Sequence, residues 1–288
     1  MYSPVVTKDP TAVEAEVQRA YLAMFPEGDR LFVSQAFGWA IDCFTGQFPE
    51  YQQIDAKYHD FEHTLQGTLC MIRLLHRRHE AGAQPPLTPE MFRLGLLAIL
   101  LHDTGYLKRC TDVKGTGAKY TVTHVARSAE FAETLLRKKH FRTSDIRSVQ
   151  NMIFCTGINT VLDEIPFQSE IERIVGFALG TADLLGQMAA DDYVDKLPTL
   201  YSEFAEAARH EPGKKSTVSL FTSAEDLIRK TPGFWGGYVR PKLARDFRNL
   251  FLFLSDPYPS GSNEYVERIE TNMERIRRRL EDVKVPAA

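Results

Sequence analysis

The chain lacks the features that mark several specialised classes of protein. Its four cysteines are scattered without a C-x-x-C spacing, which indicates neither a zinc knuckle nor a disulfide framework and favours reduced thiols. Its formal net charge is only −3, so no general attraction for nucleic acid or for anionic membranes is expected. The apolar run 94–101 is far shorter than the roughly 18 residues of a membrane span. Residues 1–10 lack the apolar core of a signal peptide, and we expect a cytoplasmic protein.

The sequence also shows no convincing alternating strand pattern, no hairpin pair and no internal repeat. Nearly every periodic stretch has helical spacing, and the expected helices cover 11–24, 31–46, 61–81, 89–102, 121–139, 144–156, 170–189, 191–209, 223–230, 241–254 and 262–282. Asp60 and Thr88 precede two of these segments and carry side-chain oxygens that can cap a helix. The predicted fold class is therefore all-α.

Three regions are expected along the chain: an N-terminal helical extension over 1–29, a main domain over 30–210 and a C-terminal helical region over 211–288. The stretch HEPGKKS at 210–216 separates the last two as a linker or long loop. The last expected helix carries apolar side chains at alternating three- and four-residue steps. This seam either packs on its own domain or forms a homodimer interface, and its short length favours the first alternative.

An imidazole and a carboxylate, His102 and Asp103, stand side by side at the end of the most apolar stretch of the sequence. Burial of these two groups costs free energy unless something compensates them. A metal ion does so directly, because it takes neutral imidazole and ionised carboxylate as ligands. Further candidates for such a site are His63 upstream, and His124 and Asp183 downstream. Any one of these residues taken alone is more often a satisfied core or surface group than a ligand.

Asp183 lies in an otherwise apolar helical stretch and shares one stripe of it with Gly176, Gly180 and Gln187. A carboxylate in such a stretch must find a partner. The two glycines either clear space for an ion and a substrate or allow close packing of helices. Gln187, on the same stripe, is a candidate for substrate binding.

The joint pattern H…HD…D formed by His63, His102, Asp103 and Asp183 resembles the HD superfamily of metal-dependent phosphohydrolases. In that family these positions are metal ligands on separate helices of an all-α core. The resemblance covers roughly residues 30–210 and implies an HD-domain helical bundle with additional C-terminal helices. It also implies one divalent ion held by the four residues, with Asp103 shared with a second, weaker ion.

The stretch YHDFEH at 58–63 resembles the Y-H-N-x-x-H signature of class I cyclic nucleotide phosphodiesterases. By that match His59 would be the general acid that protonates the leaving oxygen, and His63 would be a metal ligand. A nearby carboxylate would hold the proton on His59 beside a metal centre. The chain departs from the signature at Asp60, which replaces Asn, and at Tyr106, where those enzymes usually have a histidine. No glutamine that would clamp a purine is identifiable in the C-terminal part.

The segment 123–132 resembles the H-x-x-x-(S/G)-A-E segment of many bacterial HD proteins. In members with two fully protein-ligated metals, such as the HD-GYP group, that histidine binds the second ion and a His pair follows on the next helix. Here the corresponding stretch NMIFCTG at 151–157 has no histidine, and the GYP signature is absent. The resemblance therefore leaves His124 as a direct ligand of the second ion or as a close site residue, with water completing the coordination of that ion.

A basic loop follows the His-Asp pair and contains Lys108, Arg109, Lys114 and Lys119. Lys108 and Arg109 are candidates to hold a substrate phosphate, for which the arginine offers a bidentate fork. The alternative for each of these residues is a solvated basic loop.

Two imidazoles and two carboxylates without a thiolate suit Mn²⁺, Fe²⁺, Co²⁺ or Zn²⁺ at the first site and Mg²⁺ or Mn²⁺ at the wetter second site. The expected activity is hydrolysis of a small phosphoester, with Asp103 and His59 as the catalytic residues. A phosphodiester such as a cyclic nucleotide is the favoured substrate. Two alternatives are a nucleotide monophosphatase or nucleotidase of the same superfamily, and a non-catalytic metal-binding HD signalling protein.

Overall fold

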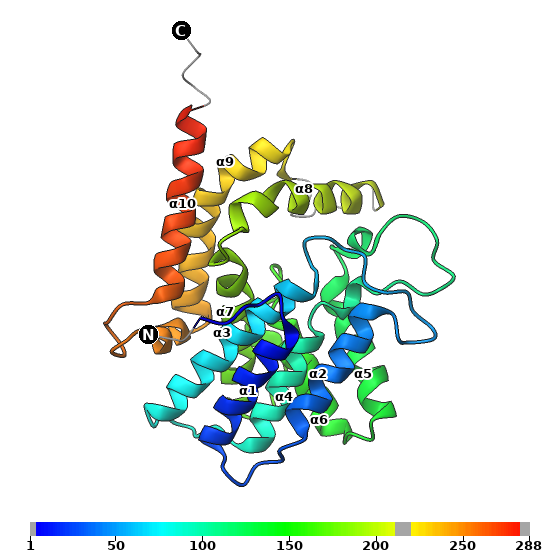
Figure 1. Ribbon diagram of the computed structural model, residues 1–288, viewed down its shortest axis with the longest axis vertical. Helices are drawn as coiled ribbons and strands as arrows, with labels where there is room; N and C mark the ends of the chain where they lie inside the picture. The colour runs from blue at the N-terminus through cyan, green and yellow to red at the C-terminus, as the bar shows by residue number, and fades with distance from the viewer. Residues whose placement is uncertain (1–3, 211–219, 283–288) are drawn as a thin grey trace.

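The fold contains no β-strand over the residues that the computed structural model describes, 4–210 and 220–282 (Figure 1). This confirms the predicted all-α class. The helices are α1 (Pro10–Met24), α2 (Phe32–Thr45), α3 (Phe61–Glu80), α4 (Pro89–Leu101), α5 (His124–Lys138), α6 (Thr143–Phe154), α7 (Glu170–Met188), α8 (Tyr193–His210), α9 (Ala224–Phe234) and α10 (Glu264–Asp282).

Two helices begin at the capping residues that the sequence offers. Asp60 Oδ1 accepts a hydrogen bond from His63 N at 2.8 Å, and Thr88 Oγ1 accepts one from Met91 N at 3.1 Å. Each acceptor satisfies an amide of the first turn that has no partner within the helix. Asp60 thereby fixes where α3 begins and holds His63 in its first turn.

The prediction of one continuous helix over 241–254 is wrong. A π-helical turn at Lys242–Asp246 and a 3₁₀ turn at Leu250–Leu254 occupy this segment. Between them, Arg248 and Asn249 have φ values of 52° and 59°. These values lie in the left-handed region, which a right-handed helix cannot contain, so the chain changes direction there.

Helices α3 and α7 pack against each other at the centre of the bundle, and α4 packs on both (Figure 1). A Cβ added to Gly186 of α7 would lie 2.8 Å from the backbone of Gln66 on α3. Only glycine allows two backbones to approach so closely. The apolar side chains of α4 from Leu94 to Leu101 are buried. Three segments with predicted ligands therefore belong to one rigid apolar core.

Helices α8 and α9 lie across one end of this bundle, and α10 stands upright at its side, in contact with α9 and α7 (Figure 1). On α10, the side chains of Ile269, Met273 and Ile276 have no exposed surface. Asn272 Nδ2 donates a hydrogen bond to Met188 O at the end of α7, at 2.9 Å. These three side chains of the seam therefore pack on helices of their own chain, and a homodimer stays a prediction.

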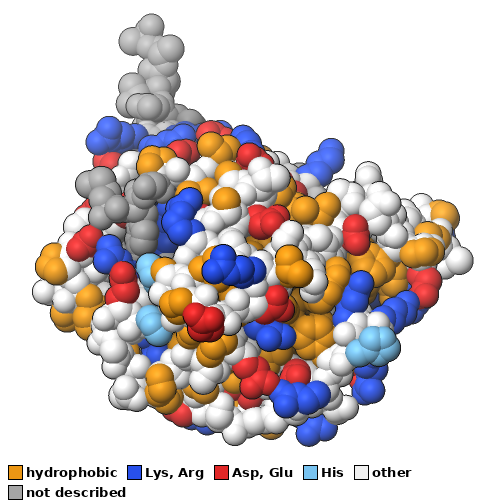
Figure 2. Space-filling view, turned by 60° about the horizontal axis from the view of Figure 1, so that its bottom comes forward, with side chains coloured by type: hydrophobic (Ala, Val, Ile, Leu, Met, Phe, Trp, Pro, Cys, Tyr) orange, Lys and Arg blue, Asp and Glu red, His pale blue; other side chains and the backbone are white. Residues whose placement is uncertain are grey.

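The division of the chain at 29 and 210 stays a prediction. Both α1 and α10 pack on helices of the central region, and most of the expected linker at 210–216 lies outside the described residues. None of the described helices is long and apolar enough to cross a membrane. Acidic and basic side chains alternate over the face drawn in Figure 2, in keeping with the small net charge.

Candidate metal centre

The four predicted first-site ligands converge at one end of the core. His63 lies in the first turn of α3, His102 and Asp103 directly follow α4, and Asp183 lies within α7. His63 Nε2 is 3.3 Å from Asp103 Oδ2 and 3.3 Å from Asp183 Oδ1. His102 Nε2 is 3.3 Å and 3.5 Å from the same two oxygens. Ligands of one ion lie at such distances, because metal–ligand bonds of about 2.1 Å separate tetrahedral neighbours by roughly 3.4 Å.

Two buried atoms of this cluster, His102 Nε2 and Asp103 Oδ2, have no hydrogen-bond partner among the described residues. The two residues are only 1% and 2% exposed, and the contact between these atoms lacks the geometry of a hydrogen bond. Buried polar atoms are nearly always paired in folded proteins, so this exception needs an explanation. A cation supplies one, because both atoms offer it lone pairs. His63, His102 and Asp103 thus form a buried group that can hold a metal ion.

The other ring nitrogen of His102 is held by the backbone. His102 Nδ1 is 2.7 Å from Ile99 O, so the proton of the neutral ring resides on Nδ1 and leaves a lone pair on Nε2. His124 Nδ1 is held in the same way, 2.6 Å from Thr121 O. Each imidazole is thereby oriented by the turn of chain that immediately precedes it.

Within the cluster, the charges of neighbouring side chains shift the pKa values of the histidines and aspartates in the direction opposite to the effect of burial. Burial alone lowers the pKa of His63, but the adjacent carboxylates of Asp103 and Asp183 outweigh it and raise that pKa to about 10. The pKa of His102 is raised against burial by the same two carboxylates. Burial would in turn raise the pKa of both carboxyl groups, but the two imidazoles hold it below its ordinary value. A proton on His63 balances the carboxylates of the metal-free protein, and a cation would take its place.

His124 lies beside this cluster without being part of it. Its Nε2 is 3.9 Å from Asp103 Oδ1, whereas the contacts with His63 and His102 use Asp103 Oδ2. The two oxygens of Asp103 therefore face different imidazoles. Burial lowers the pKa of His124, which favours the neutral ring that a metal requires. Its part as a ligand of a second ion stays a prediction.

His59 pairs with Glu203, a residue that sequence reasoning missed. Glu203 Oε2 is 2.6 Å from His59 Nδ1, and Glu203 Oε1 accepts a hydrogen bond from Tyr58 N at 2.7 Å. Burial raises the pKa of Glu203, but the charge of His59 and these hydrogen bonds lower it overall. The carboxylate that would hold a proton on His59 thus comes from α8. No local sequence spacing could reveal the pairing of His59 with Glu203, because the two residues are far apart in the sequence and α8 has an ordinary amphipathic pattern.

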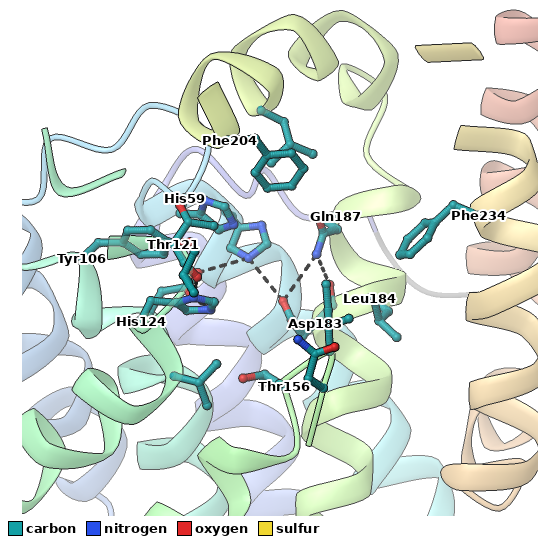
Figure 3. Close-up of a pocket in the computed structure, with 18 of the residues that line it drawn as sticks. His59, Tyr106, Thr121, His124, Thr156, Asp183, Leu184, Gln187, Phe204 and Phe234 are labelled. Carbon is teal, nitrogen blue, oxygen red and sulfur yellow. Dashed lines mark hydrogen bonds and ion pairs between the residues drawn. The ribbon is translucent and has the colours of Figure 1, made fainter. Parts of the chain in front are cut away.

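Tyr106 packs against both outer histidines of the site, His59 and His124, whose ring centroids are 6.1 Å apart. Its ring stacks on His59 at a centroid distance of 4.6 Å and on His124 at 4.9 Å. Figure 3 shows the three rings side by side. The tyrosine that departs from the phosphodiesterase signature therefore fixes the planes of both imidazoles by packing on them.

A cavity of about 590 Å³ opens beside the cluster. His59, His63, Asp103, His124 and Asp183 all contribute to its lining, and Figure 3 shows the labelled members of this set around it. The other walls come from α7, α8, α9 and the turn after α6. The predicted ligands and His59 thus surround one cavity that is large enough for a small molecule.

Gln187 lines this cavity, but its amide is engaged within the protein. Its Oε1 accepts a hydrogen bond from Tyr58 OH at 2.9 Å. Its Nε2 donates one to Asp183 O at 2.9 Å, and Figure 3 shows Gln187 and Asp183 together. Gln187 therefore braces α7 against the segment that carries His59. Its predicted contact with a substrate stays a prediction.

The basic loop does not reach the cavity. Lys108 Nζ is 2.9 Å from Asp55 Oδ2 and donates to Gly115 O, and the guanidinium of Arg109 lies 3.6 Å from Glu50 on the outside. Lys119 pairs with Asp112 in the same way. Neither these lysines nor Arg109 is among the cavity-lining residues. Their placement gives no support to the prediction that Lys108 and Arg109 hold a phosphate, because nearby carboxylates already hold their charges.

The two glycines of the α7 stripe serve helix packing. A Cβ on Gly176 would lie 2.9 Å from Cys155 Sγ, and one on Gly180 would lie 2.5 Å from Phe247 Cζ. Both glycines face other parts of the core, and neither lines the cavity. The close-packing alternative is therefore confirmed.

Neither a protein-family model nor a curated protein matches this chain. The class of this protein is therefore described from its fold and its site alone. Over the described residues, the protein is all-helical and carries a buried His-His-Asp group that can hold a metal ion.

Proposed function

We propose that the protein is a metal-dependent phosphohydrolase of the HD superfamily that cleaves a phosphodiester. The observation that carries this proposal is the convergence of His63, His102, Asp103 and Asp183 from three separate helical segments. Three of these residues are distant from one another in sequence, so a shared ligand explains their meeting better than local structure does. The orphaned atoms His102 Nε2 and Asp103 Oδ2 support the same interpretation.

These four residues would hold the first ion, and Asp103 would share a second ion with His124 and water. Asp103 suits this shared position because its Oδ2 lies beside His63 and His102 while its Oδ1 faces His124. A bound divalent ion supplies the activation of water, lowering its pKa from 15.7 to about 7, and neutralises charge on phosphoryl oxygens. The ions expected are Mn²⁺, Fe²⁺, Co²⁺ or Zn²⁺ at the first position and Mg²⁺ or Mn²⁺ at the second.

His59 would act as the general acid. Its Nδ1 is held by Glu203, and its ring lies on Tyr106 at the edge of the cavity. This arrangement leaves Nε2 free to give a proton to the leaving oxygen as the bond from phosphorus to that oxygen breaks. Water contributes the new bond to phosphorus, so the products are an alcohol and a phosphomonoester.

A cyclic nucleotide is the first substrate to test, on the resemblance of the segment 58–63. The nucleotidase alternative calls for committed positive charge near the metals, and the placement of Lys108 and Arg109 argues against it. A non-catalytic metal-binding protein is the alternative from a different class. Bound metal without turnover of any phosphoester would indicate this non-catalytic alternative.

The test is hydrolysis of bis-p-nitrophenyl phosphate against p-nitrophenyl phosphate with added Mn²⁺, for the wild type and for Asp103→Ala. We expect turnover of the diester that Asp103→Ala abolishes. Turnover of the monoester alone would move the assignment to a nucleotidase. No turnover of either ester by a protein shown to contain metal would contradict the phosphodiesterase proposal.

A further inference from the structure

The walls of the cavity beyond the His-Asp cluster are mostly apolar, and their polar members include Asn159 and Thr160 of the turn after α6 and Thr231 of α9. Leu184 and Met188 of α7, Leu197 and Phe204 of α8 and Phe234 of α9 line these walls. In Figure 3, Phe204 and Phe234 stand apart from the histidines, on the sides of the cavity formed by α8 and α9. The site therefore has two parts: a polar end at the His-Asp cluster and a mostly apolar chamber.

The chamber offers little for a second anionic group. Among the described lining residues, Lys230 alone is a lysine or arginine. Its Nζ is 2.8 Å from Asp226 Oδ2 and 2.9 Å from Leu220 O, and its side chain is 51% exposed. A neighbouring carboxylate thus already balances its charge. An additional phosphate in the chamber would be removed from water without a partner, which is costly.

The wall of the chamber formed by α7 is poorly equipped to recognise a nucleobase. Gln187, the amide of α7 in this lining, makes hydrogen bonds with Tyr58 through its oxygen and with Asp183 O through its nitrogen. A base would need such groups free, because its ring edge carries donors and acceptors that require partners when buried. A hydrocarbon group makes no such demand.

Apolar side chains continue to the mouth of the cavity. Leu220 and Ile158 line it, and they are 60% and 43% exposed. Large apolar side chains exposed around a cavity commonly mark a binding site for apolar ligands. They would contact the end of a substrate too long for the chamber itself.

We infer that the substrate is a singly charged phosphodiester with a large hydrocarbon group, which occupies the chamber of Leu184, Phe204 and Phe234 while the phosphate lies at the metal cluster. This inference rests on the proposed hydrolase function and names its substrate class. It replaces the cyclic nucleotide as the preferred substrate. The leaving group faces His59, and the hydrocarbon group stays on the product phosphate or on the leaving alcohol.

The test uses alkyl p-nitrophenyl phosphates with methyl, butyl and octyl groups, below their micelle-forming concentrations, on the Mn²⁺-loaded full chain. Because each buried methylene favours binding about fourfold, kcat/KM should rise at least about tenfold from methyl to octyl. Equal kcat/KM across the series would overturn the inference while leaving the hydrolase proposal intact. Faster turnover of a cyclic nucleotide than of the octyl ester would also overturn it.

Calorimetric binding separates failure of the inference from failure of the proposed function. Octyl methyl phosphate and dimethyl phosphate serve as the probes, again with the Mn²⁺-loaded protein. Binding of the octyl compound at least about tenfold tighter, in a protein that hydrolyses no ester, would uphold the apolar ligand class and reject the hydrolase. Equal binding of both compounds would overturn the ligand class.

Two variants locate the hydrocarbon group. Phe234→Asp and Leu220→Asp place a carboxylate in the wall and at the mouth, and each should reduce the octyl-to-methyl ratio to below about threefold. Val113→Asp is the matched control, because Val113 is 83% exposed and does not line the cavity. The octyl-to-methyl ratio of kcat/KM for Val113→Asp should equal that of the wild type. A wild-type ratio in both Phe234→Asp and Leu220→Asp would exclude this chamber as the place of the hydrocarbon group.

Discussion

We expect the candidate metal centre to depend most on Asp103. Its Oδ2 lies 3.3 Å from both His63 Nε2 and His102 Nε2, and no described group gives this oxygen a hydrogen bond. Asp103→Asn keeps the shape of the side chain and removes its charge. Loss of a residue that merely orients a ligand costs metal affinity about 10- to 100-fold, so we expect a loss of more than about 100-fold here. Metal analysis after dialysis at fixed free Mn²⁺ measures it.

The matched control for this substitution is Asp163→Asn. Asp163 is exposed in a short 3₁₀ turn away from the cluster, and its substitution should leave the metal content unchanged. Circular dichroism of both variants shows whether the helices persist. A full complement of metal in folded Asp103→Asn would show that the cluster is not the metal site.

Glu203 acts on the chemistry through His59, and we describe it as a positioning residue. Its carboxylate fixes His59 Nδ1 at 2.6 Å, so its loss should impair proton donation. Glu203→Gln is expected to slow hydrolysis of diphenyl phosphate about 100-fold but that of bis-p-nitrophenyl phosphate less than about tenfold, because p-nitrophenolate leaves without an acid. The metal content should stay unchanged.

Glu206→Gln provides the comparison, since Glu206 lies one turn further along α8 and bonds Thr116 instead of a histidine. It should preserve the wild-type ratio of the two rates. Equal slowing of both substrates in Glu203→Gln would indicate a structural role and contradict the positioning of an acid.

At the scale of the helices, the site depends on how closely α3 and α7 approach. His63 and Asp183 sit on these two helices, and Gly186 lets their backbones meet. Gly186→Ala places a methyl group 2.8 Å from Gln66 backbone atoms, which must separate the helices. We expect a loss of about 1–3 kcal/mol in the free energy of unfolding, together with weaker metal binding. Denaturant titration and metal analysis measure the two effects.

A second glycine in a helix supplies the control. Gly38 lies within α2, and a Cβ there would meet no atom within 4 Å. Gly38→Ala should leave metal binding unchanged and raise stability by up to about 1 kcal/mol, because alanine is the better helix former. If Gly186→Ala behaved like Gly38→Ala, the close approach of the helices would not be needed for the site.

At the scale of the whole molecule, the charge of the cluster links stability to pH. The pKa of His63 is raised to about 10, so its contribution to stability is complete below its unfolded pKa near 6.5 and is lost as the pH rises toward 10. We therefore expect the melting temperature of the metal-free protein to fall between pH 7 and pH 9.5. The Mn²⁺-loaded protein should lack this fall, because the ion has displaced the proton.

Thermal unfolding in a chelator and in excess Mn²⁺ at both pH values measures this difference. His63→Gln should remove the difference, whereas His76→Gln, on the same helix away from the cluster, should preserve it. A parallel fall in both metal states of the wild type would contradict the displacement of a proton by the ion.

Much of the fold and the centre of the site follow from local sequence. Asp60 and Thr88 mark helix starts because capping is a contact between neighbours in the chain. The predicted helix boundaries agree with the structure for most segments. They fail at 241–254 because Arg248 and Asn249 adopt a left-handed backbone, which Asn tolerates better than other non-glycine residues but Arg does not favour. His63, His102, Asp103 and Asp183 could be predicted to meet because their joint pattern resembles that of the HD superfamily, whereas none of them alone indicates a metal site.

The sequence by itself determined the helices and the kinds of atoms available to a metal, since periodicity, capping and ligand chemistry are properties of short segments. Only the tertiary structure decided which distant groups meet. It paired Glu203 with His59, held Lys108 away from the cavity with Asp55, and placed α9 over the apolar chamber. These pairings depend on how helices far apart in the chain pack against each other. Because each pair joins distant segments, local spacing in the sequence does not predict it.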